Sequence, residues 1–266
     1  MRTDAPAVPP ALETALEVLR ARGLELRRGS EPPSPEQARP SVSTGHAALD
    51  AALGTGGWPR GALALLDAPP GAGATSLALG SVAAVQDAGG LAAWLDLDGT
   101  LDPAVAARRG VDLAWLLVAH PRDPAEAIEL AAWLGRSGLI DLLVLDLGER
   151  PGVDRRALDR LGGVLARSEG TAALLLAPGA RAVAGAVAGV RVAVHRSAWL
   201  AVGTDLVGQR VRVTVERHRW ALAGGAAELD LWFVEGRRLD ALAPALAEPR
   251  SDVIEERPAL RVVRSA

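Results

Sequence analysis

Ala68-Pro69-Pro70-Gly71-Ala72-Gly73-Ala74-Thr75-Ser76 is the stretch that decides the fold of this chain. It lies between a short apolar run at residues 62–66 and a segment with helical spacing of its apolar residues. A phosphate-binding loop occupies this context, and its usual sequence is G-x-x-x-x-G-K-[ST]. In that register Ala68 stands at the first glycine and Ala74 at the lysine, while Gly73 and Thr75 match. The loop is recognisable, but its positive charge is missing.

The absence of this lysine bears directly on phosphate chemistry. The residue normally neutralises the β- and γ-phosphates, and does so more strongly in the transition state of phosphoryl transfer. The whole chain contains no lysine, yet arginine, the replacement that keeps the charge, does not occur at position 74. Backbone amides of residues 71–75 at a helix N-terminus still favour an anion. We therefore expect no ATP hydrolysis, no required cofactor and at most weak binding of ATP and Mg²⁺ by Gly71, Gly73, Thr75 and Ser76.

Composition sets broad limits on the protein. The chain has 266 residues, enough for one large domain with small appendages. It contains no cysteine, and its four histidines have spacings that suggest no zinc cluster, so we expect no metal centre. The formal net charge of −3 argues against a general electrostatic footprint on DNA. With no signal-peptide pattern and no apolar run of membrane-span length, a cytoplasmic protein is expected.

Four segments follow from the distribution of apolar, proline and charged residues. Residues 1–28 contain apolar side chains at helical spacing, and residues 29–42 are rich in Pro, Ser and Glu. We interpret them as an N-terminal helix and a linker. Residues 43–239 form the expected core, and residues 240–266 lack a clear period and are interpreted as a tail. The helix would have to dock its apolar face on its own core or on a neighbouring molecule.

The core alternates short apolar runs with helical segments, which is typical of an α/β fold with a mainly parallel sheet flanked by helices. Asp102-Pro103 and Asp123-Pro124-x-Glu126 predict helix starts, and Gly110 and Gly138 predict helix ends. After about residue 190 helical patterns stop, and antiparallel strands are expected at the C-terminal side of the sheet. The expected parallel strands are residues 62–66, 92–97, 116–119, 142–147 and 171–176, and the later strands are residues 190–194, 199–203, 209–216 and 228–234.

Three further segments resemble the core of the RecA recombinase family. Thr44-Gly45-x-x-x-Leu49-Asp50-x-x-Leu53-Gly54-x-Gly56-Gly57-x-Pro59-x-Gly61 is similar to the family's approach to the Walker A strand. Trp94-Leu95-Asp96-Leu97-Asp98-Gly99-Thr100-Leu101-Asp102-Pro103 resembles the segment with the family's catalytic glutamate. Arg136-Ser137-Gly138-Leu139-Ile140-Asp141-Leu142-Leu143-Val144-Leu145-Asp146 resembles the Walker B strand. The resemblance covers roughly residues 41–238 and implies a fold of the P-loop NTPase type.

The chain departs from that family at the positions that carry its chemistry. Besides Ala74, Asp98 falls where the family has the glutamate that orients the attacking water, and its shorter side chain reaches less far. Ala177-Pro178 occupies the strand end at which the family has Asn-Gln, the Gln being its γ-phosphate sensor. Proline offers neither an amide hydrogen nor a carboxamide. Asp146 is retained, either for residual Mg²⁺ binding or as ordinary scaffolding.

A basic pair near the end of the core also matches the family. Arg217-His218-Arg219 aligns with residues that reach the nucleotide across the subunit interface of the family's filaments. Here Arg217 and Arg219 either make such contacts in trans with an anion, meet an acidic partner surface, or form a solvated strand end. The family's longer DNA-binding loop has no counterpart in the short Gly/Ala-rich residues 179–189, so DNA binding is expected to be weak or indirect.

Within the RecA-like proteins, this combination resembles the ImuA proteins, accessory factors of bacterial mutagenic translesion synthesis. The resemblance implies a non-hydrolysing pseudo-ATPase in the DNA-damage (SOS) response that acts through protein partners. The implied partners are an ImuB-like inactive homologue of Y-family polymerases and an error-prone C-family DNA polymerase, with RecA as a further candidate. These partners would associate the protein with the nucleoid.

Two other functions remain open from the sequence. One is a working NTPase whose cation comes in trans from Arg217 or Arg219 of a neighbouring subunit. It predicts hydrolysis that rises with protein concentration. The other is a DNA-binding filament former, which predicts salt-sensitive binding to single-stranded DNA.

Overall fold

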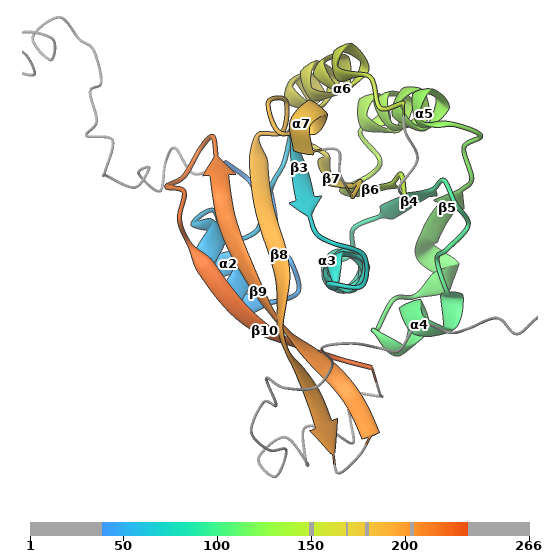
Figure 1. Ribbon diagram of the computed structural model, residues 1–266. Helices are drawn as coiled ribbons and strands as arrows, with labels where there is room; N and C mark the ends of the chain where they lie inside the picture. The colour runs from blue at the N-terminus through green and yellow to red at the C-terminus, as the bar shows by residue number, and fades with distance from the viewer. Residues whose placement is uncertain (1–38, 149–151, 169, 179–180, 203–204, 234–266) are drawn as a thin grey trace, which may run out of the picture.

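The computed structural model describes residues 39–148, 152–168, 170–178, 181–202 and 205–233. Eight strands of these residues form one sheet in the order β10-β9-β8-β3-β7-β6-β4-β5, and β1 and β2 form a separate ribbon. Figure 1 shows helices on both faces of the sheet. The strands are β1 (Ser41–Val42), β2 (Trp58–Pro59), β3 (Ala62–Asp67), β4 (Ala92–Asp96), β5 (Leu116–Ala119), β6 (Leu142–Asp146), β7 (Ala172–Leu176), β8 (Val190–Val202), β9 (Asp205–His218) and β10 (Ala226–Trp232). The helices are α2 (Ala47–Leu53), α3 (Ala74–Asp87), α4 (Pro103–Arg108), the 3-10 helix η2 (Leu113–Trp115), α5 (Pro124–Ser137), α6 (Arg155–Ser168) and α7 (Arg181–Ala184).

The parallel part of the sheet forms because its strands are apolar on both faces. β3, β4, β6 and β7 consist of buried Ala, Leu and Val, apart from Trp94 and the aspartate that ends each of β3, β4 and β6, and each pairs in parallel with its neighbours. Burying a leucine completely stabilises the fold by about 1.5–3 kcal/mol, so these strands are stable only when both faces are covered. The predicted parallel α/β sheet is confirmed.

Two apolar layers cover the sheet. One core surrounds α3 and includes Leu77 and Val82, together with three valines of β8 and three of β9: Val190, Val192, Val194, Val211, Val213 and Val215. The other lies under α5 and α6 and includes Ile128 and Leu161. In Figure 1, α3 lies on one side of the strands and α5, α6 and α7 lie on the other.

The predicted helix ends agree with the structure. The Asp102 carboxylate accepts hydrogen bonds from the backbone of Ala104 and Val105 at the start of α4. Asp123 caps α5 in the same way by accepting from the Glu126 amide, at 2.9 Å. α5 ends at Gly138, whose φ of 70° is the left-handed conformation that glycine adopts without steric penalty.

The C-terminal strands correct one sequence expectation. Residues 190–194 and 199–203 were expected to form two strands, but β8 is a single strand of 13 residues. The chain stays in the sheet between these parts because β9 pairs with β8 throughout, and register shifts near Arg196 and Leu200 absorb the irregular spacing. β8 is parallel to β3 and antiparallel to β9, and β9 is antiparallel to β10. The predicted antiparallel extension is confirmed.

The expected segments outside the core are tested only at one boundary. The N-terminal helix at 1–28, most of the linker at 29–42 and the tail at 240–266 lie outside the described residues and stay predictions. The last two linker residues, Ser41 and Val42, form β1 and pair with Pro59 and Trp58. The linker boundary was therefore too late, because Val42 belongs to the buried core. Among the described residues, no helix has the length and apolar character needed to cross a bilayer.

Candidate functional site

The central feature of the site is the loop between β3 and α3. β3 ends at Asp67, and α3 begins at Ala74 with Gly73 as its N-cap residue. Gly71 and Gly73 have φ angles of 74° and 104°, a region that residues with a Cβ rarely adopt. A side chain on Gly73 would also collide with Leu231 of β10. Gly71 and Gly73 therefore serve the geometry of the loop itself.

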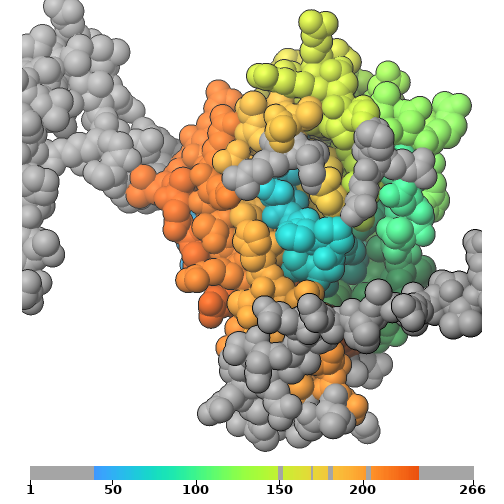
Figure 2. Space-filling view, in the orientation of Figure 1, coloured from blue at the N-terminus to red at the C-terminus, as the bar shows by residue number. Residues whose placement is uncertain are grey.

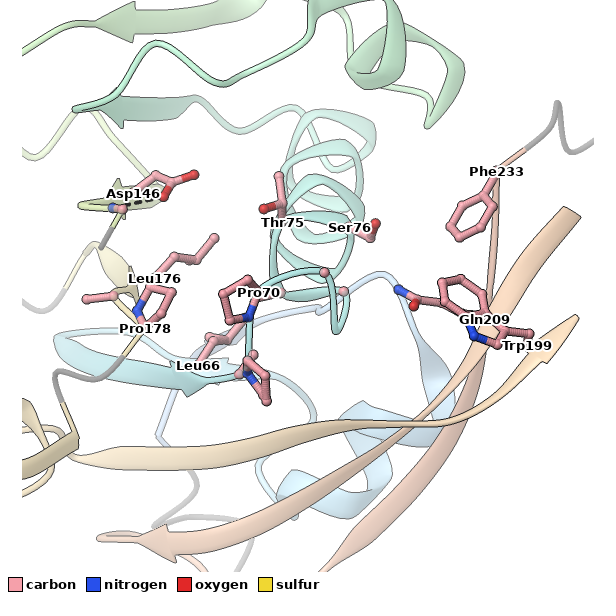
Figure 3. A pocket seen from close by; sticks show the side chains of 17 residues that line it. Leu66, Pro70, Thr75, Ser76, Asp146, Leu176, Pro178, Trp199, Gln209 and Phe233 are labelled. Carbon is pink, nitrogen blue, oxygen red and sulfur yellow. Dashed lines mark hydrogen bonds between the residues drawn. The ribbon is translucent and has the colours of Figure 1, made fainter. Parts of the chain in front are cut away.

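A cavity of about 390 Å³ opens beside this loop. Its walls come from the loop, from the ends of β6 and β7, from β8 and β9, and from Phe233 just after β10, as Figure 3 shows. In Figure 2 the cyan segment that contains the loop and the start of α3 reaches the surface beside the orange C-terminal strands. Among the predicted site residues, those that line the cavity are Ala68, Gly71, Gly73, Ala74, Thr75, Ser76, Asp146 and Pro178.

The position of the missing lysine is apolar in the folded protein. Ala74 lines the cavity and also packs against the core around α3. The hydroxyl-bearing residues Thr75 and Ser76 follow it in the first turn of α3. The loop can offer backbone amides and hydroxyl groups to an anion, but it contributes no charged side chain.

The acidic side of the site is formed by three aspartates. Asp96 ends β4 and pairs in register with Asp146 at the end of β6. Its buried carboxylate accepts hydrogen bonds from the amides of Thr100 and Leu101, at 3.0 and 2.9 Å, and so fixes the turn that carries Asp98. Burial raises the pKa of the Asp146 carboxyl from 3.8 to about 6, and the charges of Asp96 and Asp98 add to the rise. Asp146 is therefore only partly charged near pH 6.

Asp98 does not line the cavity, although it lies close to it. The Asp98 carboxylate lies where a Cβ on Gly148 would be, and Gly148 is part of the cavity wall. Asp98 is exposed. Asp98 and Asp146 thus both lie near the loop, as expected, but Asp98 stands beside the cavity wall and not in it.

Mg²⁺ would find few ligands here. Thr75 and Asp146 line the same cavity and offer the oxygen ligands that Mg²⁺ prefers. No group of three His, Asp or Glu side chains that could hold a metal occurs among the described residues. These two residues fit the usual arrangement of a P-loop Mg²⁺ site, in which phosphate oxygens and waters supply the other ligands.

The predicted basic pair lies elsewhere in the chain's own fold. Arg217 donates to the carbonyl oxygens of Gly185 and Ala186, at 2.8 and 3.0 Å. The guanidinium of Arg219 lies 5.8 Å from the ring centroid of Trp220. In the sheet, Arg217 of β9 lies opposite Arg191 of β8, and Arg191 lies opposite Leu65 of β3. Arg217 is therefore beside the middle of β3 and away from the end that leads into the loop. Within one chain neither arginine lines the cavity, and contact in trans stays a prediction.

The structure adds four site residues that the sequence analysis missed. Trp199, Gln209 and Phe233 line the cavity, and the rings of Trp199 and Phe233 meet edge to face at 6.3 Å. Arg196 reaches the loop, where its Nη1 lies 3.3 Å from the carbonyl oxygen of Gly71. The alternation of buried valines in β8 was the available signal, because it places residue 196 on the face that carries α3.

These features define the class of protein. A parallel sheet with a glycine-containing loop between a central strand and the N-terminus of α3 is the architecture of P-loop proteins. The model of the RecA N-terminal domain matches residues 26–150. The protein RecA of Thermus thermophilus is 35% identical over 272 aligned positions, which cover 88% of this chain and 78% of the relative. This chain belongs to the RecA family.

Two other matches agree with this assignment. The protein RecA of Listeria monocytogenes serotype 4a is 33% identical over 230 positions, covering 74% of this chain and 66% of that protein. The crystal structure of the RadB recombinase superposes with a TM-score of 0.55 at 20% identity, covering 71% of this chain and 95% of that one. At this identity the RadB likeness supports the fold alone.

Proposed function

We propose that this chain is a RecA-family accessory protein that does not hydrolyse ATP and acts through protein partners in DNA-damage-induced mutagenic translesion synthesis. One observation carries the proposal. The phosphate loop keeps the second glycine of its motif, Gly73, and a cavity beside it, while Ala74 and Pro178 face that cavity at the positions of the catalytic lysine and the γ-phosphate sensor. The chain therefore keeps the family's fold at this site but lacks the side chains that carry out its chemistry.

The energetics of phosphoryl transfer support the loss of turnover. Preorganised hydrogen-bond donors that stabilise the transition state commonly contribute about 2.7–4 kcal/mol each, or about 10²–10³ in rate. Both the lysine and the carboxamide are replaced by groups without charge or side-chain hydrogen bonds. Their combined absence would bring hydrolysis close to background.

Exposed apolar side chains support a role in binding proteins. β5 is one of the two edge strands of the described sheet, and Leu117 on it is 49% exposed. The adjoining Leu113 and Trp115 are 43% and 64% exposed. Tryptophan is among the residues that contribute most to protein–protein binding, and an edge strand offers unpaired backbone groups.

The proposed activity is tested by measuring hydrolysis and partner binding in the same preparation. We expect turnover at background over a concentration series of the full chain, with and without single-stranded DNA. We also expect binding to an ImuB-like polymerase homologue that Trp115→Ala weakens by at least about 10-fold, as an interface hot spot would. Trp133→Ala is the matched control, since Trp133 is 62% exposed but belongs to α5 on the other face of the sheet.

Two results would contradict the proposal. Turnover that rises with protein concentration and disappears in Arg217→Ala or Arg219→Ala would establish an NTPase with a cation in trans. Failure of the full chain to bind either polymerase-type partner would remove the accessory role. Removal of residues 1–28 or 240–266 then tests whether those segments contribute to partner binding.

A further inference from the structure

Arg196 stands on β8 at the place where that strand passes the phosphate loop. Val190, Val192 and Val194 are buried in the core around α3, and side chains alternate between the faces of a strand. Arg196 continues this row, so its side chain lies on the same face as α3. β3 pairs with β8 only as far as Asp67 and Ala193, and Arg196 therefore lies just beyond the end of β3, where the loop begins.

The contacts of Arg196 hold a positive charge beside the loop without neutralising it. Its Nη1 donates to the Gly71 carbonyl oxygen at 3.3 Å and to Oε1 of Gln209 at 3.4 Å. Both distances are long for a charged donor, which commonly bonds at about 2.7–2.9 Å. The guanidinium lies 4.0 Å from the ring centroid of Trp199, a stacked position that leaves its edge donors available. Among the described residues, no carboxylate pairs with it.

Gln209 supplies a second donor directed at the same place. Its side chain is only 3% exposed, and its Nε2 lies 3.1 Å from the position of a Cβ on Gly73. Figure 3 shows the carboxamide extending from β9 toward the loop. Within the described chain this Nε2 makes no hydrogen bond, whereas its Oε1 accepts from Arg196. Gln209 lines the cavity, so this amide nitrogen can donate to an anion bound there.

We propose that Arg196 replaces the missing lysine as the phosphate-binding cation of this site, in cis and together with Gln209. The ligand is a nucleoside polyphosphate whose phosphates lie against the amides of residues 71–75. On binding, the guanidinium exchanges its two long hydrogen bonds for charge-assisted bonds to phosphate oxygens. This inference rests on the proposed function, because it describes a bound and unhydrolysed nucleotide.

Calorimetry on the full chain tests the role of Arg196. The probes are ATP, ADP and inorganic triphosphate, each with and without Mg²⁺. We expect Arg196→Ala to weaken the binding of ATP and triphosphate about 10- to 100-fold, the loss that corresponds to a hydrogen bond with a charged group. Arg196→Lys should recover part of the affinity. Similar affinities for ATP and triphosphate would assign recognition to the phosphates, and a clear preference for ATP would add the nucleoside.

A matched variant separates this role from a general effect of charge. Arg212 pairs with His195 across the same two strands and is exposed, with its side chain on the opposite face from Val211 and Val213. Arg212→Ala therefore removes one positive charge from this hairpin and should leave binding unchanged. Equal binding by wild type and Arg196→Ala, equal weakening in both alanine variants, or no binding of any probe by the wild type would overturn the inference. ATP turnover by the wild type would instead overturn the proposed function and leave the role of Arg196 to be judged by affinity.

Discussion

Replacing Asp146 by asparagine should stabilise the protein at neutral pH and not at acidic pH. The rise in the pKa of Asp146 from 3.8 to about 6 means that the folded protein disfavours the charged carboxylate. Between these two pH values the folded chain keeps a proton that the unfolded chain has released. The free energy of unfolding therefore falls as pH rises through this window and is level above it.

The size of the effect follows from the same shift. Each unit of pKa corresponds to about 1.4 kcal/mol, so the rise from 3.8 to about 6 corresponds to a destabilisation of the folded state by about 3 kcal/mol when Asp146 is charged. Asp146 lines an open cavity, and solvent there reduces the expected gain for Asp146→Asn to about 1–3 kcal/mol at pH 7–8. Asparagine keeps an acceptor for the long 3.4 Å hydrogen bond from the Gly148 amide.

Urea unfolding from pH 4.5 to 8, followed by tryptophan fluorescence, measures this difference. Trp94 is fully buried in β4, the strand next to β6, and reports on the sheet near the site. Glu129→Gln on the exposed side of α5 is the control, expected to change stability by less than about 0.5 kcal/mol at every pH. An advantage of Asp146→Asn that is the same at pH 4.5 and pH 8 would refute the reasoning, because the effect would then not come from ionisation.

Three further substitutions test other parts of the structure. Ala74→Lys should tighten triphosphate binding about 10-fold in calorimetry, as one added charged contact would, while turnover stays at background; hydrolysis would contradict the importance of Pro178. Asp102→Ala should lower the free energy of unfolding by about 1 kcal/mol in urea titrations, because the cap of α4 is lost, and an unchanged midpoint would argue against that cap. Gly57→Ala should cost about 2–4 kcal/mol, since a Cβ there would overlap the Val42 carbonyl at a φ of 145°; Gly89→Ala, with open space around it, should cost clearly less.

Much of the site could be located from the sequence because it is local in the chain. The loop residues from Ala68 to Ser76 are consecutive, and the carboxyl ends of parallel strands must meet at one edge of the sheet, which brings Asp146 and Pro178 to the same cavity. The missing charge at Ala74 could be read directly. The degree to which burial raises the pKa of Asp146 could not, because it depends on what covers the carboxylate.

The C-terminal strands show what local pattern leaves undecided. The sequence predicted strands there, but it predicted a break within β8, at residues 195–198, where the alternation of apolar residues is weak. Pairing with β9 across the whole length overrides that weakness, since hydrogen bonds from a neighbouring strand do not depend on the side chains in between. The same pairing determines that Arg196 and Gln209 lie beside the loop.

The sequence by itself determined the α/β fold, the phosphate loop and the loss of its lysine, because periodicity and a contiguous motif depend only on neighbouring residues. Only the tertiary structure decided that a cation from β8 and a buried amide from β9 approach Gly71 and Gly73, more than 100 residues away in the chain. No local rule encodes that approach. It results from the register of three strands and from β8 extending past the end of β3, which are set by the packing of the whole sheet.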